Sequence, residues 1–364
     1  MRPHLRFALL TCLLVAPIAL ADDVPDTRFA ETVEVSEVLL DILVTDRDGN
    51  VVLGLAPEDF VIEDEGEERR ATGLSFYSNR FKMREGVVDE IQHPAPGEVL
   101  SDRHFVLFFH DPRAYGNGGN LLRRHLEATR RAKEWVQKEM LPGDWVAVAS
   151  YDYKLKIQQD FTQDPEALER AIQNTAKGID PANEWESRRP EISEGVPTLL
   201  NGLPSGKELR KETTRIYDAI RLLADSTRGI VGRKSLLLFT VGFGDVRQSG
   251  GLISEPDRRF YPPMKQALND NNVAVYPINL VASSFNIQGN FLNQLAADSG
   301  GSYYENFVSF ITPIKQIADE NNGYYLLSYQ AEHPSGENGY RDVKVRVKNP
   351  EFRVRARKGY RFGS

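Results

Sequence analysis

The chain contains almost no cysteine: Cys12 is the only one among 364 residues, and it lies in an apolar run near the start of the sequence. With no other thiol available, the chain forms no internal disulfide and builds no zinc or iron–sulfur site from several thiolates. Proteins that depend on a disulfide framework or on cysteine ligands are therefore excluded.

Basic residues are not in excess. The sequence has 45 Lys and Arg against 52 Asp and Glu, which gives a formal net charge of −7. Nucleic-acid-binding proteins normally need a basic face that neutralises phosphates. The basic stretch within 121–140 also contains glutamates, so we interpret it as a solvated helix face. The composition therefore argues against a nucleic-acid partner.

Long apolar runs are absent after the first 21 residues, so no later segment has the roughly 20 apolar residues of a membrane-spanning helix. At the N-terminus, Arg2 and Arg6 precede an apolar run that ends with small residues at Ala19 and Ala21. This pattern predicts a secretory signal peptide over residues 1–21, cleaved near Ala21. We expect an exported protein, periplasmic or secreted, without a transmembrane segment in the mature chain.

The segment 22–100 is rich in strand patterns, and its apolar stretch over 33–44 is followed by an Asp-Arg-Asp-Gly-Asn turn. Asp46, Asp48 and Asn50 have the alternate spacing of a calcium loop, but the further acidic ligands of such a loop are missing. We therefore predict a turn between strands and no ion. The polar residues 79–102 are predicted to form a connector.

From 101 to 321, apolar runs alternate with helical patterns. Strands are predicted over 104–109, 145–157, 235–240, 273–279 and 302–304. Helices are predicted over 121–140, 165–172, 214–225, 264–271, 291–298 and 307–320. Strands buried on both faces and alternating with helices predict an α/β fold with a doubly wound, mostly parallel, Rossmann-like sheet. Residues 178–212, rich in Gly, Pro and charge, are predicted to be a long surface insertion.

The tail 322–364 returns to alternating apolar and polar residues, which is typical of antiparallel strands with one wet face. About 40 residues would be marginally stable alone. We therefore expect the tail to pair with 22–100 in an antiparallel β-sandwich that contains or flanks the α/β domain. Two separate small β units are the alternative.

Several motifs in the middle segment point to a known family. Asp111 ends the first buried strand, and residues 214–220 read Thr-Arg-Ile-Tyr-Asp-Ala-Ile. Residues 236–242 correspond to a strand that ends in Thr-Asp-Gly in that family. Residues 295–304 contain a helical pattern followed by two glycines and two tyrosines, which also occurs there. On these residues the segment resembles the von Willebrand factor A (VWFA) fold. The chain after residue 21 is similar to VWFA-related proteins of the acidobacterial type.

This resemblance implies a metal-ion-dependent adhesion site, in which a partner carboxylate completes the shell of a divalent cation. The family pattern needs Asp-x-Ser-x-Ser, a threonine and a second aspartate. Here Asp111 and Thr214 match, whereas the serine positions hold Arg113 and Tyr115 and the second aspartate position holds Val241. Hard cations such as Mg²⁺ need more oxygen ligands than these. We therefore expect a degenerate site without a cofactor, in which Arg113 places a fixed positive charge beside Asp111.

Other motifs do not indicate catalysis. Residues 298–301, Asp-Ser-Gly-Gly, resemble the nucleophile motif of trypsin-like proteases but lack its β-barrel context. The glycine-rich stretch 116–119 lacks the remaining residues of a phosphate-binding loop. The histidines form no zinc-binding pair with a glutamate. We therefore predict that the protein is not an enzyme, and a hydrolase with an unrecognised site is the weakest alternative.

The sequence favours an exported protein-interaction or adhesion module that works without a metal ion. Its binding crevice is predicted beyond the carboxyl ends of the parallel strands, at Asp111, Arg113, Tyr115, Thr214 and Val241. A structural envelope component that uses the edges of the β-sandwich is one alternative. Metal-dependent adhesion is another, if an additional oxygen such as that of Asp245 rebuilds the site. In each case we expect a protein partner.

Overall fold

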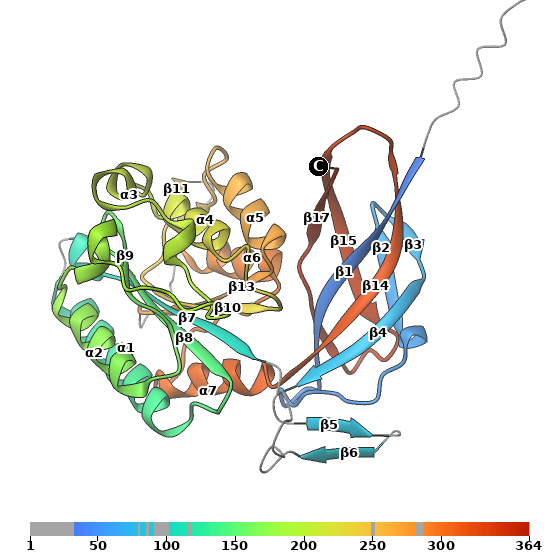
Figure 1. Cartoon of the computed structure of the whole chain (residues 1–364), viewed down its shortest axis with the longest axis horizontal. Helices are drawn as coiled ribbons and strands as arrows, with labels where there is room; N and C mark the ends of the chain where they lie inside the picture. The colour runs from blue at the N-terminus through green and yellow to red at the C-terminus, as the bar shows by residue number, and fades with distance from the viewer. Residues whose placement is uncertain are drawn as a thin grey trace, which may run out of the picture.

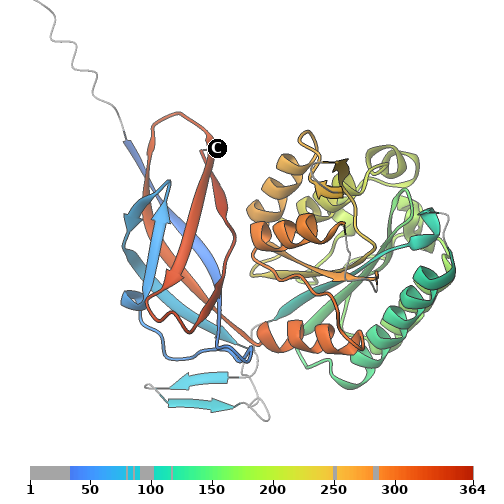
Figure 2. The same ribbon diagram turned by 180° about the vertical axis from the view of Figure 1, so that it is seen from behind.

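The computed structural model describes residues 33–78, 81–84, 87–90, 102–115, 118–248, 252–281 and 287–363. The predicted signal peptide and its cleavage site lie outside these ranges. Figures 1 and 2 show two units side by side, an α/β unit and a unit made of β-strands that contains the C-terminus. None of the helices within the described ranges combines the length and apolarity needed to cross a membrane.

The α/β unit is built on a five-stranded sheet with the order β13-β10-β7-β8-β9. Its parallel strands are β7 (Arg103–His110), β8 (Asp144–Tyr151), β10 (Lys234–Thr240) and β13 (Val273–Asn279). The edge strand β9 (Leu155–Thr162) runs antiparallel to β8. The prediction of a mostly parallel sheet in an α/β fold is confirmed.

Two strand predictions in this unit were wrong. The single strand expected over 145–157 is the hairpin β8–β9, because the chain turns between Tyr151 and Leu155 with Tyr153 at a φ of 98°. A tyrosine at positive φ is uncommon, and the apolar pattern gives no sign of it. The strand expected over 302–304 is reduced to one bridge between Tyr304 and Ile278.

Helices cover both faces of the sheet because its buried side chains alternate between two hydrophobic clusters. Phe105, Leu107 and Phe109 face one side, and Val106 and Phe108 face the other. The first side is covered by α1 (Gly118–Lys138), α2 (Pro165–Lys177) and α7 (Ile311–Glu320). The second is covered by α4 (Ile216–Ser226), α5 (Tyr261–Asp270) and α6 (Gly289–Ser299).

The segment 178–212 is more than the surface insertion that its composition predicts. It contains short 3₁₀ turns and the helix α3 (Gly206–Glu212). Leu199, Leu200, Leu203 and Leu209 are buried in the core on the α4 side of the sheet. Apolar anchors separated by glycine and proline escape a search for periodic patterns, which explains the error.

The β unit contains two four-stranded sheets, each combining strands from both ends of the chain. One has the order β16-β1-β14-β4, comprising β16 (Arg353–Arg355), β1 (Val33–Thr45), β14 (Gly323–Pro334) and β4 (Ala71–Ser78). The other has the order β17-β15-β2-β3, comprising β17 (Gly359–Phe362), β15 (Gly339–Val347), β2 (Phe60–Asp64) and β3 (Glu67–Arg69). Side chains of both sheets form one hydrophobic cluster.

Between the units, local order differs from the prediction, whereas the turn predicted after β1 is confirmed. The expected connector 79–102 contains a hairpin of β5 (Phe81–Arg84) and β6 (Val87–Glu90). In the turn after β1, Asp46 accepts hydrogen bonds from the backbone N–H groups of Asp48 and Asn50 at 2.9 and 2.8 Å. The aspartate at the head of this turn therefore stabilises its backbone.

The β unit packs against the end of the α/β unit where the parallel strands begin. Arg103, the first residue of β7, forms a buried ion pair with Asp144 at 2.6 Å and donates to the Asn322 side chain just before β14. Arg357 donates to the carbonyl of Asn269 at the end of α5. The carboxyl ends of the strands, where the predicted site lies, are at the opposite edge of the sheet.

Candidate functional site

The candidate site lies at the carboxyl ends of β7, β8 and β10. Asp111 follows β7 directly, and its backbone N–H donates to the carbonyl of Tyr151 at the end of β8. The hydroxyl of Tyr151 donates to the carbonyl of Thr214 at 2.9 Å. Parallel strands all present their carboxyl ends at one edge, so residues distant in sequence meet there.

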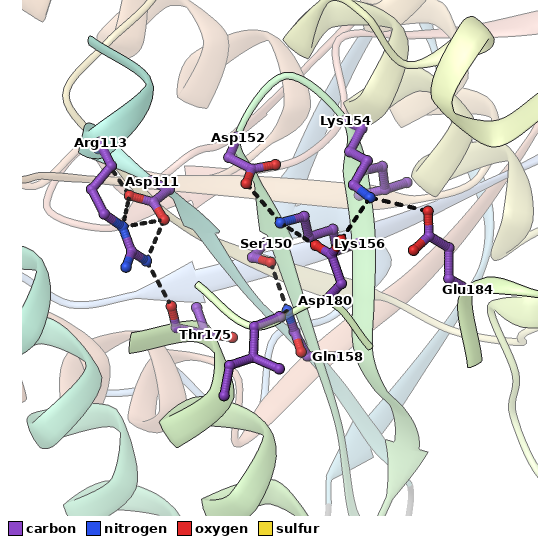
Figure 3. A network of polar contacts seen from close by, with 12 residues as sticks. Asp111, Arg113, Ser150, Asp152, Lys154, Lys156, Gln158, Thr175, Asp180 and Glu184 are labelled. Carbon is purple, nitrogen blue, oxygen red and sulfur yellow. Dashed lines mark hydrogen bonds and ion pairs between the residues drawn. The ribbon is translucent and has the colours of Figure 1, made fainter. Parts of the chain in front are cut away.

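Asp111 is held by Arg113 in a close ion pair (Figure 3). Nε of Arg113 lies 2.9 Å from each carboxylate oxygen, Nη2 lies 2.5 Å from Oδ2, and the backbone N–H of Arg113 donates to Oδ1 at 2.9 Å. Burial by itself would raise the pKa of Asp111, but the hydrogen bonds from Arg113 outweigh it and hold that pKa below the ordinary value. Asp111 is therefore an ionised carboxylate whose two oxygens are both engaged.

The guanidinium of Arg113 lies against the C-terminus of α2. Its Nη2 also donates to the carbonyl of Thr175 at 3.2 Å. Gly178, which ends α2 with a φ of 71°, leaves the space that the guanidinium fills, since a Cβ there would lie 2.8 Å from Nη2. A cation at a helix C-terminus interacts favourably with the helix dipole. Arg113 is thus fixed by Asp111 on one side and by α2 on the other.

The structure brings only part of the predicted crevice together. Thr214 is exposed and is linked to Asp111 through Tyr151, with no hydrogen bond between the two among the described residues. Val241 is half-buried against the hydrophobic cluster on the α1 side of the sheet. Tyr115 ends the 3₁₀ turn after Asp111, and its side chain lies outside the described part of the chain.

Asp245, the residue considered as a replacement ligand, is exposed at the start of the short strand β11 (Asp245–Gln248). Burial raises the pKa of Tyr217 to about 12, and the nearby Asp245 carboxylate adds to that rise. Tyr217 is on α4, so Asp245 faces this helix. Among the described residues, no hydrogen bond links Asp245 to the residues around Asp111.

The residues present do not fit a divalent cation. A cation at the position that the resemblance implies would need the Asp111 oxygens, and both already accept hydrogen bonds from Arg113. The guanidinium would also repel a cation at that distance. Throughout the described ranges, no group of three or more His, Cys, Asp or Glu side chains is arranged to hold a metal ion. We therefore assign no role at this site to a metal ion.

Two buried histidines lie beside Asp111. His110, on β7, is fully buried, and its Nδ1 lies 2.8 Å from the hydroxyl of Thr240 at the end of β10. His125, on α1, is also buried and interacts electrostatically with Asp111. Burial lowers the pKa of His110 to about 3 and that of His125 to about 4. Both are therefore neutral near pH 7.

A second polar network fixes the segment 178–212 to the edge strand β9 (Figure 3). Lys156 is buried and pairs with Asp152 and Asp180 at 2.6 Å each. Lys154 pairs with Asp180 at 3.1 Å and with Glu184 at 3.0 Å. The sequence sign of this network is the group of charged residues Asp152, Lys154 and Lys156 at the turn into β9. The network gives the rim of the site a defined shape.

The protease-like motif has a structural role. Ser299 is buried, and its hydroxyl donates to the carbonyl of Leu295 at 2.9 Å and accepts the backbone N–H of Val275 at 3.0 Å. Gly300 then ends α6 at a φ of 81°. Ser299 therefore ties the end of α6 to β13, and its buried hydroxyl is not placed to attack a substrate.

No protein-family model matches the sequence, and no curated protein matches it. Among solved structures, similarity is found to proximal thread matrix protein 1 from the mussel byssus, with 14% identity and a TM-score of 0.37 over 61% of this chain and 48% of that one. The chain thus spans about half the length of the mussel protein.

Two further solved structures are similar at the same level. A D319A mutant of the PilB minor pilin from Streptococcus sanguinis has 10% identity and a TM-score of 0.40, over 77% of this chain and 92% of that one. The von Willebrand factor type A structure from Catenulispora acidiphila has 7% identity and a TM-score of 0.36, over 80% and 72%. Similarities at these values carry no information on function.

Proposed function

We propose that this protein is an exported protein-binding module that engages its partner at the carboxyl edge of the α/β sheet without a metal ion. The observation that carries the proposal is the Asp111–Arg113 pair, in which both carboxylate oxygens accept hydrogen bonds from the guanidinium. The pair supplies a fixed positive group where the resemblance to the VWFA fold implies a cation.

Charge balance supports this replacement. A divalent cation held by two carboxylates has no net charge, and neither has a guanidinium held by one carboxylate. In this chain Val241 stands at the position of the second aspartate, so the site has one carboxylate fewer. This loss matches the exchange of a doubly charged cation for the singly charged Arg113. The two changes together leave the charge of the site unaltered, whereas either change alone would leave it charged.

Arg113 retains the capacity to bind a partner. Its side chain is 35% exposed, and its Nη1 group makes no hydrogen bond to any of the described residues. A guanidinium anchored on one side presents its remaining N–H groups in a fixed plane, which suits a carboxylate acceptor. We propose that an acidic side chain of the partner accepts hydrogen bonds from Nη1.

Binding rather than catalysis is favoured by the chemistry of the site. Its histidines are buried and neutral, the charge of its ionised aspartate is balanced by Arg113, and Ser299 is engaged elsewhere. A hydrolytic site needs a nucleophile within hydrogen-bond reach of a base. These residues do not supply that arrangement, so we propose that the protein is not an enzyme.

The test is a quantitative capture experiment in EDTA with extracts of the source cells. The wild-type protein is compared with Arg113→Gln and with the control Arg130→Gln, which changes an arginine that is 68% exposed on α1. We expect a protein that is captured by the wild type and the control and reduced at least tenfold with Arg113→Gln. Equal capture by all three proteins, or capture only after addition of Mg²⁺, would contradict the proposal.

A further inference from the structure

The first strand of the β unit has an open edge. On one side, β1 pairs with β14 from Val33 to Ile42 without a break in register. On the other side it pairs with β16 only from Leu43 to Thr45. Within the described part of the chain, no strand covers the second side of β1 between Val33 and Ile42. Natural edge strands are usually protected by charged side chains, above all lysine, by proline or by a bulge. This stretch contains no lysine, proline or bulge, and its charged residues are Glu34, Glu37 and Asp41.

The backbone groups at this edge can be assigned from the pairing. Successive residues of a strand in an antiparallel pair direct their N–H and C=O groups to opposite sides. The carbonyl of Leu39 accepts a hydrogen bond from Arg357, which lies on the side away from β14. Val35 and Glu37 therefore direct their N–H and C=O groups to the same side, and Leu39 directs its N–H there.

A groove runs along the part of this edge formed by Glu37 and Leu39, between the two units. It has a volume of about 870 Å³ and is bounded by Ser36–Leu39 of β1, by 360–363 of the β17 segment, by the second half of α4 and by α5. Figures 1 and 2 both show the β unit facing the α/β unit on this side. Val35 and Leu39 are 57% and 50% exposed, so the open edge also presents apolar side chains.

The charges around the groove favour an acidic occupant. Arg228 and Asp225 form one pair, and their side chains are 79% and 30% exposed. Arg361 and Asp270 form another pair, and their side chains are 57% and 20% exposed. In each pair the guanidinium is more accessible than the carboxylate. The other charged residues of the lining are Arg221, Arg357 and the exposed Glu37 of β1, so the groove has four arginines against three carboxylates, although the protein as a whole is acidic.

We infer that this groove binds an extended, acidic peptide segment of a partner protein, which adds as a strand to the open edge of β1. Strand addition obtains its affinity from main-chain hydrogen bonds and its selectivity from alternate side chains. The main-chain partners are the outward groups of Val35, Glu37 and Leu39, and Arg228 and Arg361 select for acidic side chains. This surface lies at the opposite end of the α/β unit from Arg113 and is independent of it.

Fluorescence anisotropy with two labelled ten-residue peptides tests this inference. One peptide alternates valine and glutamate, and the other alternates valine and lysine. We expect the glutamate peptide to bind the whole protein at least tenfold more tightly than the lysine peptide. Arg228→Glu should reduce this preference several-fold, and Arg113→Gln should leave it unchanged, which separates this surface from the proposed site at the other edge.

The substitution Leu39→Pro removes the outward N–H and places the proline ring in the path of an added strand, without removing a hydrogen bond to β14. It should weaken binding of the glutamate peptide at least tenfold. The matched control Leu39→Thr keeps the N–H and should bind within threefold of the wild type. Thermal unfolding midpoints of both variants establish that they are folded.

Three results would overturn the inference. The first is that the two peptides bind equally well, or that neither peptide binds. The second is unchanged binding by a folded Leu39→Pro variant. The third is a concentration-dependent dimer in sedimentation equilibrium that Leu39→Pro abolishes, because the occupant of the edge would then be a second copy of this chain.

Discussion

Arg113 donates hydrogen bonds to both carboxylate oxygens of Asp111, two residues before it, at the point where the central strand β7 ends. The pair lies between β7 and the C-terminus of α2, so it also closes the rim of the sheet. One residue type at one position thus decides two properties of the site. It keeps the aspartate ionised, and it places a guanidinium where the resemblance to the VWFA fold implies a cation.

Removal of the guanidinium should destabilise the protein near neutral pH. We expect Arg113→Ala to lower the free energy of unfolding by about 1–3 kcal/mol, because a nearly buried carboxylate loses its charged hydrogen bonds. The lower part of this range is expected, because a third of the Arg113 side chain is exposed to solvent screening. Urea unfolding at pH 7 measures the difference.

The pH dependence of this difference has a defined sign. The folded pKa of Asp111 lies below its ordinary value of 3.8, so the stabilisation from the pair is complete above that value and is lost as the pH falls through the folded pKa. In Arg113→Ala, burial raises the pKa of Asp111. The difference between the two proteins should therefore shrink in acid, and a difference that grows below pH 4 would be inconsistent with the pair.

The buried histidines should not titrate in the physiological range. Their folded pKa values of about 3 for His110 and about 4 for His125 predict imidazole NMR signals that stay constant between pH 8 and pH 5. Below about pH 6.5 the unfolded chain binds protons that the folded chain does not. Each histidine should thus lower the free energy of unfolding by up to about 1.4 kcal/mol per pH unit on acidification. A signal with a midpoint near pH 6.5 would show that the site is open to water.

The ion pair at the other end of the sheet should contribute more to stability than surface pairs do. Arg103→Met leaves the fully buried Asp144 without its cation, and we expect a loss of about 3–5 kcal/mol. The control Arg346→Met removes an exposed pair with Glu63 and should cost less than about 1 kcal/mol. Thermal or urea unfolding of both variants gives the comparison. Equal losses would mean that Arg103 does not anchor the start of β7.

The sequence predicts the α/β unit well because its strands are continuous apolar runs, such as Phe105–Phe109, and only a sheet buried on both faces accommodates them. The position of Asp111 follows from the end of that run. The turn at Tyr153 could not be predicted, because it depends on a positive φ that tertiary contacts impose on an ordinary residue. The hairpin of β5 and β6 was missed because each strand has four residues, only two of them apolar.

The surroundings of Asp111 were harder to predict than Asp111 itself. His125 lies 14 positions along the chain on a helix, and Thr175 and Gly178 belong to the end of another helix. They meet at the site because helices pack on the sheet, and sequence spacing does not encode such contacts. By contrast, Arg113 lies two residues from Asp111, so a local ion pair could be expected from the sequence alone.

The most direct test of the central claim is thermal unfolding of the protein in Mg²⁺, Mn²⁺ and Ca²⁺ compared with EDTA. A cation at about 100 times its Kd would stabilise the folded state by about 2.7 kcal/mol, which is a clear rise in the midpoint. With the Asp111 carboxylate engaged by Arg113, we predict no change in the midpoint with any of the three cations. A rise that disappears in Asp111→Ala would contradict the account, because it would show that a cation displaces the guanidinium.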